Sequence, residues 1–388
     1  MRIMIFSNSY APMIGGLEIS IELFRQGLIE AGHDVHLVVP EYDDYADKEP
    51  YIFRLPAMAL PGEVGFPVAA PFKAPIATTV RGIKPVLIHS QHPFWVGDLA
   101  ATFAQDLAIP LVFTFHTRYK KYTQEYISIA SELMGNVTQE IVARYLKKCT
   151  HIVAPTVSIQ EFILEEYAPA APVTVVPTPV DLSGYDKLDP QHVRTEWGLQ
   201  DTEVLLYVGR LAKEKNLGFL LHAFARIATT RPQTRLLLVG SGAEKDALQE
   251  QTRKLDLDKQ VIFTGAVHHE AVPNYAAAAD LFVFSSVTET QGMVLTEAMA
   301  AGTPVVAVEA PGPVDILAEG GGVLVPQQEQ AFAEAVLALL SDRSRLRTMG
   351  ERASEVAHGY AIPEATASLL SIYEAAIAEG PRKESPTA

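Results

Sequence analysis

SVTETQGMVLTEAMAAGTPVV, residues 286–306, joins a predicted buried strand at 280–284 to a predicted helix at 292–301. Two glutamates bracket this turn, because Glu289 lies in the loop and Glu297 lies about one turn inside the helix. The first turn of a helix carries unpaired amide donors and a partial positive charge, which suits an anionic or hydroxyl-rich ligand. Carboxylates at these positions can accept hydrogen bonds from hydroxyl groups of the same ligand. The alternative is a capped helix with two solvated acids.

Apolar strands alternate with helical segments along nearly the whole chain of 388 residues, which is typical of parallel sheets covered by helices on both faces. The alternation forms two series. In the first series, strands are predicted at 3–7, 35–39, 86–89, 111–115, 152–154 and 173–176, with a helix at 17–30 after the first strand. In the second series, strands are predicted at 204–208, 236–239, 261–264, 281–284, 305–308 and 323–325.

The two series predict an α/β protein with two facing Rossmann-like domains. The connector at 178–184 contains proline and glycine and separates the series. We predict an N-terminal domain at 1–180, a C-terminal domain at 181–361, and a final helix at 362–380 that returns to the first domain. Ligands of open parallel sheets bind beyond the C-terminal ends of the strands, so we expect the site in a cleft between the domains.

Composition excludes several classes of protein. The net charge of −15 speaks against general nucleic-acid binding, which depends on Lys and Arg neutralising phosphates. The one cysteine, Cys149, precludes an intramolecular disulfide and indicates a reducing compartment. The first residues run directly into a strand, and no uncharged stretch approaches the roughly 20 apolar residues that cross a bilayer. We therefore expect a cytoplasmic protein.

Two segments in the first half of the chain carry more basic than acidic side chains, although the protein as a whole is acidic. Residues 51–84 are apolar and proline-rich, with basic side chains at Arg54, Lys73, Arg81 and Lys84 against Glu63 alone. Residues 110–150 carry more basic than acidic side chains, the basic ones being Arg118, Lys120, Lys121, Arg144, Lys147 and Lys148. A basic, partly apolar patch can hold a protein to an anionic membrane surface, and a solvated helix face is the alternative.

Two cations follow the predicted strand at 204–208. Arg210 offers a planar fork of donors and Lys215 a compact charge, so together they can neutralise a diphosphate at the edge of the sheet. Such cations suit a leaving group that becomes more negative as its bond breaks. A loop with solvated cations is the alternative.

Glycines mark two other turns. Gly15 and Gly16 precede the first helix, where the backbone either approaches a ligand closely, adopts a positive φ or makes a simple tight turn. The segment 240–245, GSGAEK, lacks the third glycine of the dinucleotide fingerprint. This absence argues against a nicotinamide-dependent dehydrogenase.

Histidines end two strands of the first series. His116 and His92 each follow a predicted strand and could bond a ligand hydroxyl, although a strand-end histidine is often structural. Two other polar groups are not expected to bind a metal. His268-His269-Glu270 places adjacent side chains that point apart, and Asp256-Leu257-Asp258 precedes a strand instead of ending one. No metal site is predicted.

These residues resemble a known family, the retaining glycosyltransferases of GT-B architecture, which includes bacterial diacylglycerol glucosyl- and galactosyltransferases and phosphatidylinositol mannosyltransferases. The resemblance spans nearly the whole chain. It rests on four motifs in the same order: Gly15-Gly16, residues 115–119, Gly209-Arg210 with Lys215, and residues 289–297. The chain departs from the pattern at Pro179, where the family commonly has glycine, and this stiffer residue can alter domain closure.

The resemblance implies a role for each motif. Glu289 and nearby amides hold the donor sugar and phosphate, while Glu297 holds the ribose. Arg210 and Lys215 contact the diphosphate. The other residues implied at the donor site are Gly15, Gly16 with its amide near the β-phosphate, Gly209, Gly265 and Val267 near the base, and Gln291, Gly292, Met293 and Val294 through their backbone. His116 is implied near the sugar, and His92, Arg118 and Tyr119 are implied at the acceptor.

The resemblance implies a retaining transferase that moves a hexose from UDP-glucose or UDP-galactose to a lipid, in particular diacylglycerol, at the inner face of the cell membrane. No acid stands out as a nucleophile, which favours front-face departure of the diphosphate. No cofactor and no essential metal are expected, and the oligomeric state stays open. The alternatives are a soluble acceptor such as a small organic acid or glycan, a nucleotide-sugar 2-epimerase, and a silent nucleotide-sugar binding protein.

Overall fold

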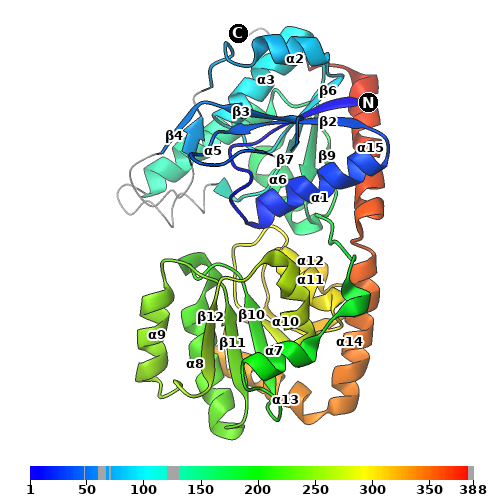
Figure 1. The fold of residues 1–388 in the computed structure, drawn as a ribbon. Helices are drawn as coiled ribbons and strands as arrows, with labels where there is room; N and C mark the ends of the chain where they lie inside the picture. Colours follow the sequence, from blue (N-terminus) through cyan, green and yellow to red (C-terminus); the bar gives the residue numbers. More distant parts are fainter. Residues whose placement is uncertain (48, 60–66, 70, 120–130, 383–388) are drawn as a thin grey trace. The chain divides into compact units, whose positions relative to one another are not determined.

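The computed structural model describes residues 1–47, 49–59, 67–69, 71–119 and 131–382 (Figure 1). The chain forms two compact units. Unit 1 comprises Met1–Pro179 with Ile362–Ala388, and unit 2 comprises Val180–Ala361. Each unit is built on a parallel sheet with helices, so the predicted α/β class with two Rossmann-like domains is confirmed. The cleft between the domains stays a prediction.

The main sheet of unit 1 has the strand order β3-β2-β1-β6-β7-β8-β9, and every neighbouring pair is parallel. Its strands are β1 Arg2–Phe6, β2 Asp34–Pro40, β3 Ile52–Leu55, β6 Leu87–Ser90, β7 Leu111–Thr114, β8 His151–Ala154 and β9 Val173–Val175. Its helices are α1 Gly16–Glu30, α2 Ala77–Ile83, α3 Val96–Leu107, α5 Ser131–Leu146, α6 Val157–Tyr167 and α15 Ile362–Glu379. A separate antiparallel pair joins β4 Ala57–Ala59 to β5 Pro67–Ala69.

The edge strand β3 was not predicted from the sequence. It is only four residues long, and it pairs with β2 in parallel register, Leu37 opposite Ile52. Arg54 within it forms an ion pair with Asp47 at 2.6 Å and donates a hydrogen bond to the carbonyl oxygen of Pro40 at 2.8 Å. This arginine therefore holds the edge strand in place. The charge count had suggested instead that it contributes to a basic surface.

The C-terminal helix α15 packs against α1 within unit 1 (Figure 1). The two helices approach closely at Gly27, since a Cβ there would lie 2.0 Å from Thr366 Oγ1. Buried side chains of α15, including Leu369, join the core on this face of the sheet. The Tyr373 hydroxyl lies 2.7 Å from Nδ1 of His89 in β6, so a hydrogen bond links the helix to the sheet.

The sheet of unit 2 has the strand order β12-β11-β10-β13-β14-β15, again parallel throughout. Its strands are β10 Val204–Val208, β11 Arg235–Val239, β12 Val261–Gly265, β13 Leu281–Phe284, β14 Val305–Val308 and β15 Gly322–Val325. Its α-helices are α7 Pro190–Glu196, α8 Leu217–Thr230, α9 Lys245–Lys254, α10 Val272–Ala278, α11 Met293–Ala300, α12 Pro313–Ile316, α13 Glu329–Ser341 and α14 Arg343–His358.

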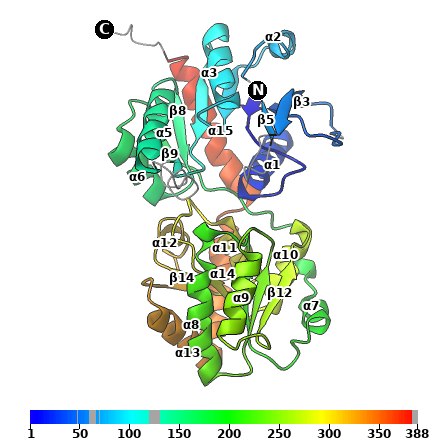
Figure 2. The ribbon, with the colours of Figure 1, turned by 90° about the vertical axis from the view of Figure 1, so that its left-hand side faces the viewer.

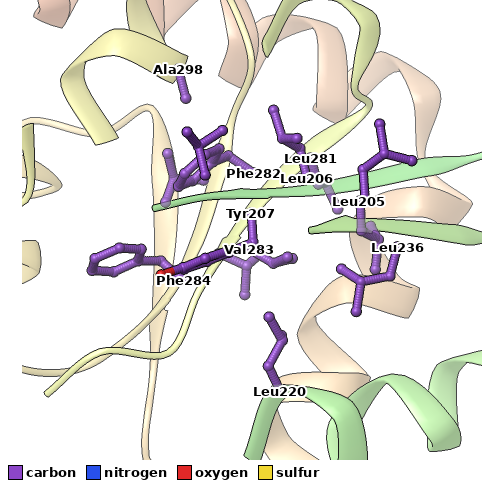
Figure 3. Packing of buried hydrophobic residues seen from close by; sticks show 14 of the residues in the cluster. Leu205, Leu206, Tyr207, Leu220, Leu236, Leu281, Phe282, Val283, Phe284 and Ala298 are labelled. Atoms are coloured by element: carbon purple, nitrogen blue, oxygen red, sulfur yellow. The ribbon is translucent and has the colours of Figure 1, made fainter. Parts of the chain in front are cut away.

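Helices cover both faces of the unit 2 sheet, with α8 and α9 on one face and α10 and α11 on the other (Figure 2). Figure 3 shows Leu220 of α8 and Ala298 of α11 on opposite sides of the strands. Strand residues such as Leu206 and Phe282 are buried between these layers. Burying each large apolar side chain contributes about 1.5–3 kcal/mol, which explains why the strands are continuous apolar runs.

In both sheets the strand order reverses beside the first strand of the unit. In unit 2, β10 lies between β11 and β13, and in unit 1, β1 lies between β2 and β6. The connections leave such a point toward opposite faces of the sheet, so the loops at its C-terminal edge diverge and ligands bind there. The loops after β10, β13, β1 and β6 are therefore the places to look for a site.

Two loops of unit 2 pack backbone against backbone beside β10. Gly240 has φ +142°, and a Cβ there would lie 1.9 Å from the carbonyl oxygen of Gly209. A Cβ on Gly242 would lie 2.3 Å from the carbonyl oxygen of Leu211, whose amide donates to the Ser241 carbonyl at 2.9 Å. The glycines of this incomplete fingerprint therefore allow the loop at 209–211 to be packed closely.

Gly240→Ala should destabilise unit 2 by about 3 kcal/mol or more, because alanine is unfavourable at this φ and its added Cβ clashes with the backbone. Gly198→Ala is the matched control, since Gly198 also has a positive φ, +66°, and an added Cβ there meets nothing within 4 Å. Thermal unfolding of the two variants measures the difference. Equal losses of stability would contradict the close packing of the loops.

Candidate functional site

Two loops of unit 2 are tied together at the strand-order reversal between β10 and β13. Ser285 Oγ donates to the carbonyl oxygen of Lys215 at 2.9 Å, and Ser286 Oγ donates to that of Glu214 at 3.1 Å. In return, Asn216 Nδ2 donates to the carbonyl oxygen of Ser285 at 3.2 Å. Because the acceptors of these bonds are backbone carbonyls, the bonds fix the distance between the two loops. This distance does not depend on the conformations of the other side chains in the loops.

Lys215 and Glu289 form an ion pair across these loops. Lys215 Nζ lies 2.6 Å from Glu289 Oε1, and the two side chains are only 19% and 17% exposed. Burial is the largest single influence on the pKa of Glu289 and raises it, but the charge and hydrogen bond of Lys215 oppose burial, and with the other partners of Glu289 they hold that pKa below its ordinary value. The Ser286 hydroxyl and the charge of Arg210 lower it further. Glu289 is thus an ionised acceptor at neutral pH, and the ammonium has three donors to share with an anion.

Arg210 is the accessible cation of this group, with its side chain 60% exposed. Its Nη2 lies 2.6 Å from Oε1 of the buried Glu214. The Tyr207 hydroxyl donates to the carbonyl oxygen of Arg210 at 3.0 Å, and Gly209 leaves room, since a Cβ there would lie 2.7 Å from that hydroxyl. Glu214 therefore orients the guanidinium while much of the group stays open to an anion.

Helix α11 begins at Met293, against a predicted range of 292–301. Its N-cap, Gly292, has φ +90° and ψ +61°, in the left-handed region that favours glycine. Gln291 is buried, and Gly312 packs on it, since a Cβ on Gly312 would lie 2.6 Å from the Gln291 carbonyl oxygen. The Leu295 amide donates to the Gly292 carbonyl oxygen at 2.9 Å, whereas the amides of Met293 and Val294 have no partner within the helix. This end of α11 therefore has the geometry of an anion-binding helix terminus.

Glu297 lies inside α11 with its carboxylate buried. His269 Nε2 lies 2.8 Å from its Oε1, and the Tyr185 hydroxyl donates to its carbonyl oxygen at 3.2 Å. The sequence gives His269 the composition of a metal ligand, a role that the spacing of its neighbours argues against, and it does not indicate a contact with Glu297. The missing information was the strand order, which brings the loop after β12 to the same edge of the sheet as α11.

The loop after β12 carries the predicted base-binding residues. Gly265 has φ +80°, and its carbonyl oxygen accepts a hydrogen bond from the Gly240 amide at 2.9 Å. Val267 is half-buried and packs against the core of unit 2. The residues predicted at the donor site of unit 2 thus follow β10, β12 and β13, all at the C-terminal edge of one sheet.

In unit 1, two predicted histidines lie at the equivalent edge, His92 after β6 and His116 after β7. His116 Nε2 lies 2.6 Å from Gln91 Oε1, and the Asn8 amide donates to His92 Nδ1 at 3.1 Å. Burial lowers the pKa of His116 to about 4 and that of His92 to about 3. Both rings are neutral at pH 7, which suits hydrogen bonding to hydroxyl groups more than binding of phosphate.

The Gly15-Gly16 turn does not adopt a positive φ, which was one of the three possibilities for these glycines. Gly15 has φ −158°, which is extended backbone, so no positive φ requires glycine there. A Cβ on Gly15 would lie 2.8 Å from Glu18 Oε2, but this atom is the far end of a flexible side chain, so packing does not require glycine there either. The other oxygen of Glu18 accepts a hydrogen bond from the Ser9 hydroxyl. A carboxylate therefore lies beside the amide implied near a β-phosphate, and a phosphate there requires Glu18 to move.

Arg118 and Tyr119 are held by aromatic rings of unit 1. The Arg118 guanidinium lies 4.8 Å from the ring centroid of Phe162. Tyr119 is buried, with its ring edge-on to Phe94 and Phe115 at 5.4 and 5.6 Å between centroids. Tyr119 is therefore part of the core, and an acceptor role for either residue stays a prediction. The neighbouring Lys120 and Lys121 lie outside the described residues.

Two protein families match the chain. The family described as "Glycosyl transferases group 1" matches residues 191–356, and "Glycosyltransferase Family 4" matches residues 14–183. The first match covers most of unit 2, including every site residue predicted in that unit. The second match covers most of unit 1.

Individual proteins are similar over most of the chain. Alpha-monoglucosyldiacylglycerol synthase from Acholeplasma laidlawii is 29% identical over 319 residues, 79% of this chain and 80% of that protein. D-inositol 3-phosphate glycosyltransferase from Kineococcus radiotolerans is 31% identical over 315 residues, 75% of this chain and 72% of that protein. Among solved structures, sucrose-phosphate synthase from Thermosynechococcus elongatus has the same fold, with a TM-score of 0.82 at 22% identity over 98% of this chain and all of that one.

Lys215→Met should destabilise unit 2 by about 1–3 kcal/mol at neutral pH, because it leaves the Glu289 carboxylate buried without its cation. Lys215→Met/Glu289→Gln removes the charge as well and should recover most of the loss. Thermal unfolding measures both variants. A single variant as stable as the wild type, or a double variant no better than the single one, would contradict the pairing.

The same variants should differ in their pH dependence. A carboxyl group whose pKa is depressed stabilises the fold above its unfolded pKa, and that stabilisation disappears as the pH falls through the folded value. Lys215→Met removes the largest of the influences that lower the pKa of Glu289, so this pKa should lie higher than in the wild type and the deficit should shrink as the pH falls toward the ordinary value of 4.5. A deficit that stays constant from neutral pH to that value would show that Glu289 is not the group responsible.

Proposed function

This chain belongs to the group 1 glycosyltransferases of GT-B architecture, and from this premise we propose that it transfers a hexose, with retention, from UDP-glucose or UDP-galactose to diacylglycerol. The observation that carries the proposal is the Lys215–Glu289 pair beside Arg210 at the strand-order reversal of unit 2. It sets two cations and an ionised carboxylate next to a helix N-terminus. Diphosphate and sugar hydroxyls are the groups that such a set can bind together.

The proposed donor complex uses each group for a separate task. Arg210 and Lys215 neutralise the diphosphate, and the first-turn amides of α11 donate to its oxygens. Glu289 keeps its bond to Lys215 and accepts a hydrogen bond from a hexose hydroxyl with its second oxygen. Glu297 accepts from the ribose. Cations and amides preorganised around the leaving group gain most as its charge grows, so they lower the barrier to departure.

The proposed transfer proceeds from the front face. The bond between the anomeric carbon and the phosphate oxygen breaks, and UDP leaves with the electron pair. The acceptor hydroxyl forms its bond to the same face of that carbon, and its proton passes to a phosphate oxygen of UDP. The neutral His116 is proposed to hold a hydroxyl of the sugar. No divalent metal takes part in this proposal, because side-chain cations and amides balance the phosphate charge.

A lipid acceptor is supported by the surface of α5. Large apolar side chains of this helix are exposed along one face, namely Leu133, Met134, Val137 and Ile141. Arg144, Lys147 and Lys148 at its C-terminal end are exposed too. Such a surface suits an anionic membrane interface. Among the helices of the described residues, none has the length and apolar character to cross a bilayer. The similar synthase from Acholeplasma laidlawii is named for a product of diacylglycerol.

A soluble acceptor is the second candidate. The similar protein from Kineococcus radiotolerans is named for D-inositol 3-phosphate, which has hydroxyls and a phosphate but no acyl chain. The two candidates share the donor site of unit 2 and differ only in what reaches the acceptor side.

Arg210→Ala and Lys215→Ala should each lower kcat by about a hundredfold or more, because each removes a cation from the developing charge of the leaving group. Lys213→Ala is the control, since Lys213 is exposed in the same loop. Release of UDP with diacylglycerol as acceptor gives the rates, and circular dichroism checks the folding. Near-normal turnover in both variants would refute the role of the cations.

Val137→Ser/Ile141→Ser should weaken binding to vesicles of phosphatidylglycerol and diacylglycerol by about three- to tenfold, because it removes apolar area from the interface. Val157→Ser/Leu164→Ser is the matched control, since these α6 residues are also exposed. Vesicle sedimentation measures the binding. Equal binding of the two double variants to vesicles would contradict the proposed lipid acceptor. The same holds if the wild type does not bind vesicles and glycosylates a soluble polyol.

A further inference from the structure

We infer that His269 is a positioning residue for the donor: it holds the Glu297 carboxylate in the orientation that receives the ribose hydroxyls of the nucleotide. The inference rests on the proposed function, since it needs a ribonucleotide at Glu297. It assigns a positioning role to a histidine for which the sequence predicts no function.

The contact joins two elements that approach only through the fold. His269 opens a 3-10 turn, His269–Ala271, after β12, and Glu297 lies in α11. The 2.8 Å bond from Nε2 engages Oε1 of Glu297. The second oxygen of this carboxylate, Oε2, remains available as an acceptor. Because the bond at Oε1 fixes the carboxylate plane, it also fixes the direction of the Oε2 lone pairs. A pair of adjacent ribose hydroxyls needs such a defined acceptor.

The backbone of Glu297 is held separately from its carboxylate. The Tyr185 hydroxyl donates to the Glu297 carbonyl oxygen at 3.2 Å, which helps to fix this turn of α11. The Glu297 side chain is 8% exposed and the His269 side chain 37%. Loss of the imidazole therefore frees the rotamer of Glu297 without removing the contact that holds its backbone. The expected defect is in ligand orientation more than in folding.

Charge makes this contact sensitive to pH. The hydrogen bond to Glu297 is the main cause that raises the pKa of His269, burial opposes it, and the charges of Asp181 and Glu270 add to the rise. The imidazolium donates from both ring nitrogens, so its bond to Glu297 does not depend on the tautomer. Neutral histidine can carry its proton on Nδ1, which turns a lone pair toward the carboxylate. The positioning should weaken as the pH rises through the raised pKa.

Calorimetry with UDP and 2′,3′-dideoxy-UDP tests the role directly. His269→Leu should raise the Kd for UDP by about five- to tenfold, as expected for loss of a charge-assisted hydrogen bond acting through a neighbour. Dideoxy-UDP lacks the hydroxyls that Glu297 receives, so wild type and His269→Leu should bind it alike. With the nucleotide sugar, KM should rise while kcat changes less than about twofold.

Two further variants separate positioning from structure. His269→Gln retains a neutral donor near Nε2, so it should bind UDP nearly as tightly as the wild type. Its preference for UDP over dideoxy-UDP should not change with pH, whereas that of the wild type should fall as the pH rises above the ordinary histidine value of 6.5. His268→Leu is the control, because His268 is the exposed neighbour on the same turn. It should resemble the wild type with both nucleotides.

Three results would overturn the inference, and they differ from failure of the proposed function. Unchanged UDP affinity in His269→Leu, or an equal loss for UDP and dideoxy-UDP, would refute positioning while leaving the transferase intact. A preference for UDP over dideoxy-UDP that falls with rising pH in His269→Gln as it does in the wild type would refute titration at this ring. If the wild type itself did not bind UDP, the proposed donor would be wrong and the inference would fall with it.

Discussion

Lys215 and Glu289 are 74 positions apart in the sequence, and their 2.6 Å contact exists because β10 and β13 are neighbours in the sheet. The serine hydroxyls that follow β13 bond to backbone carbonyls beside Lys215, which sets the spacing of the loops before any ligand binds. Glycines on the other side pack the loop at 209–211 against the end of β11. A strand order that separated β10 from β13 would leave two solvated charges and no site.

The parts of this arrangement that depend on local pattern could be predicted from the sequence. The apolar runs predict β10 and β14 with their observed bounds, and the turn residues before α11 predict the helix start to within one residue and the loop position of Glu289. The family suggested by the motifs is confirmed by the matches over both halves of the chain. Local signals suffice here because a buried parallel strand and a glycine N-cap each have their own sequence signature.

What could not be predicted depends on which elements become neighbours. β3 was missed because a four-residue edge strand containing arginine lacks a continuous apolar run. The bond between His269 and Glu297 required the order of β12 and β13, and Glu18 beside Gly15 required a side-chain rotamer. The ring of Tyr119 lies among Phe94 and Phe115, which the sequence did not indicate, and its predicted role at the acceptor stays a prediction. Sequence spacing alone does not distinguish an aromatic residue of the core from one at a ligand.

The two units carry different chemistry. Unit 2 brings together two cations, the ionised Glu289 carboxylate and a helix N-terminus, whereas the strand ends of unit 1 carry histidines that burial keeps neutral. The first set suits a diphosphate and the second suits hydroxyl groups, which agrees with a nucleotide-sugar donor and a hydroxyl acceptor. A crystal structure of the protein soaked with UDP-glucose tests this most directly. We predict the diphosphate within hydrogen-bond distance of Arg210 and Lys215, with a hexose hydroxyl on Glu289. A donor bound elsewhere, or cations turned away from it, would contradict the account.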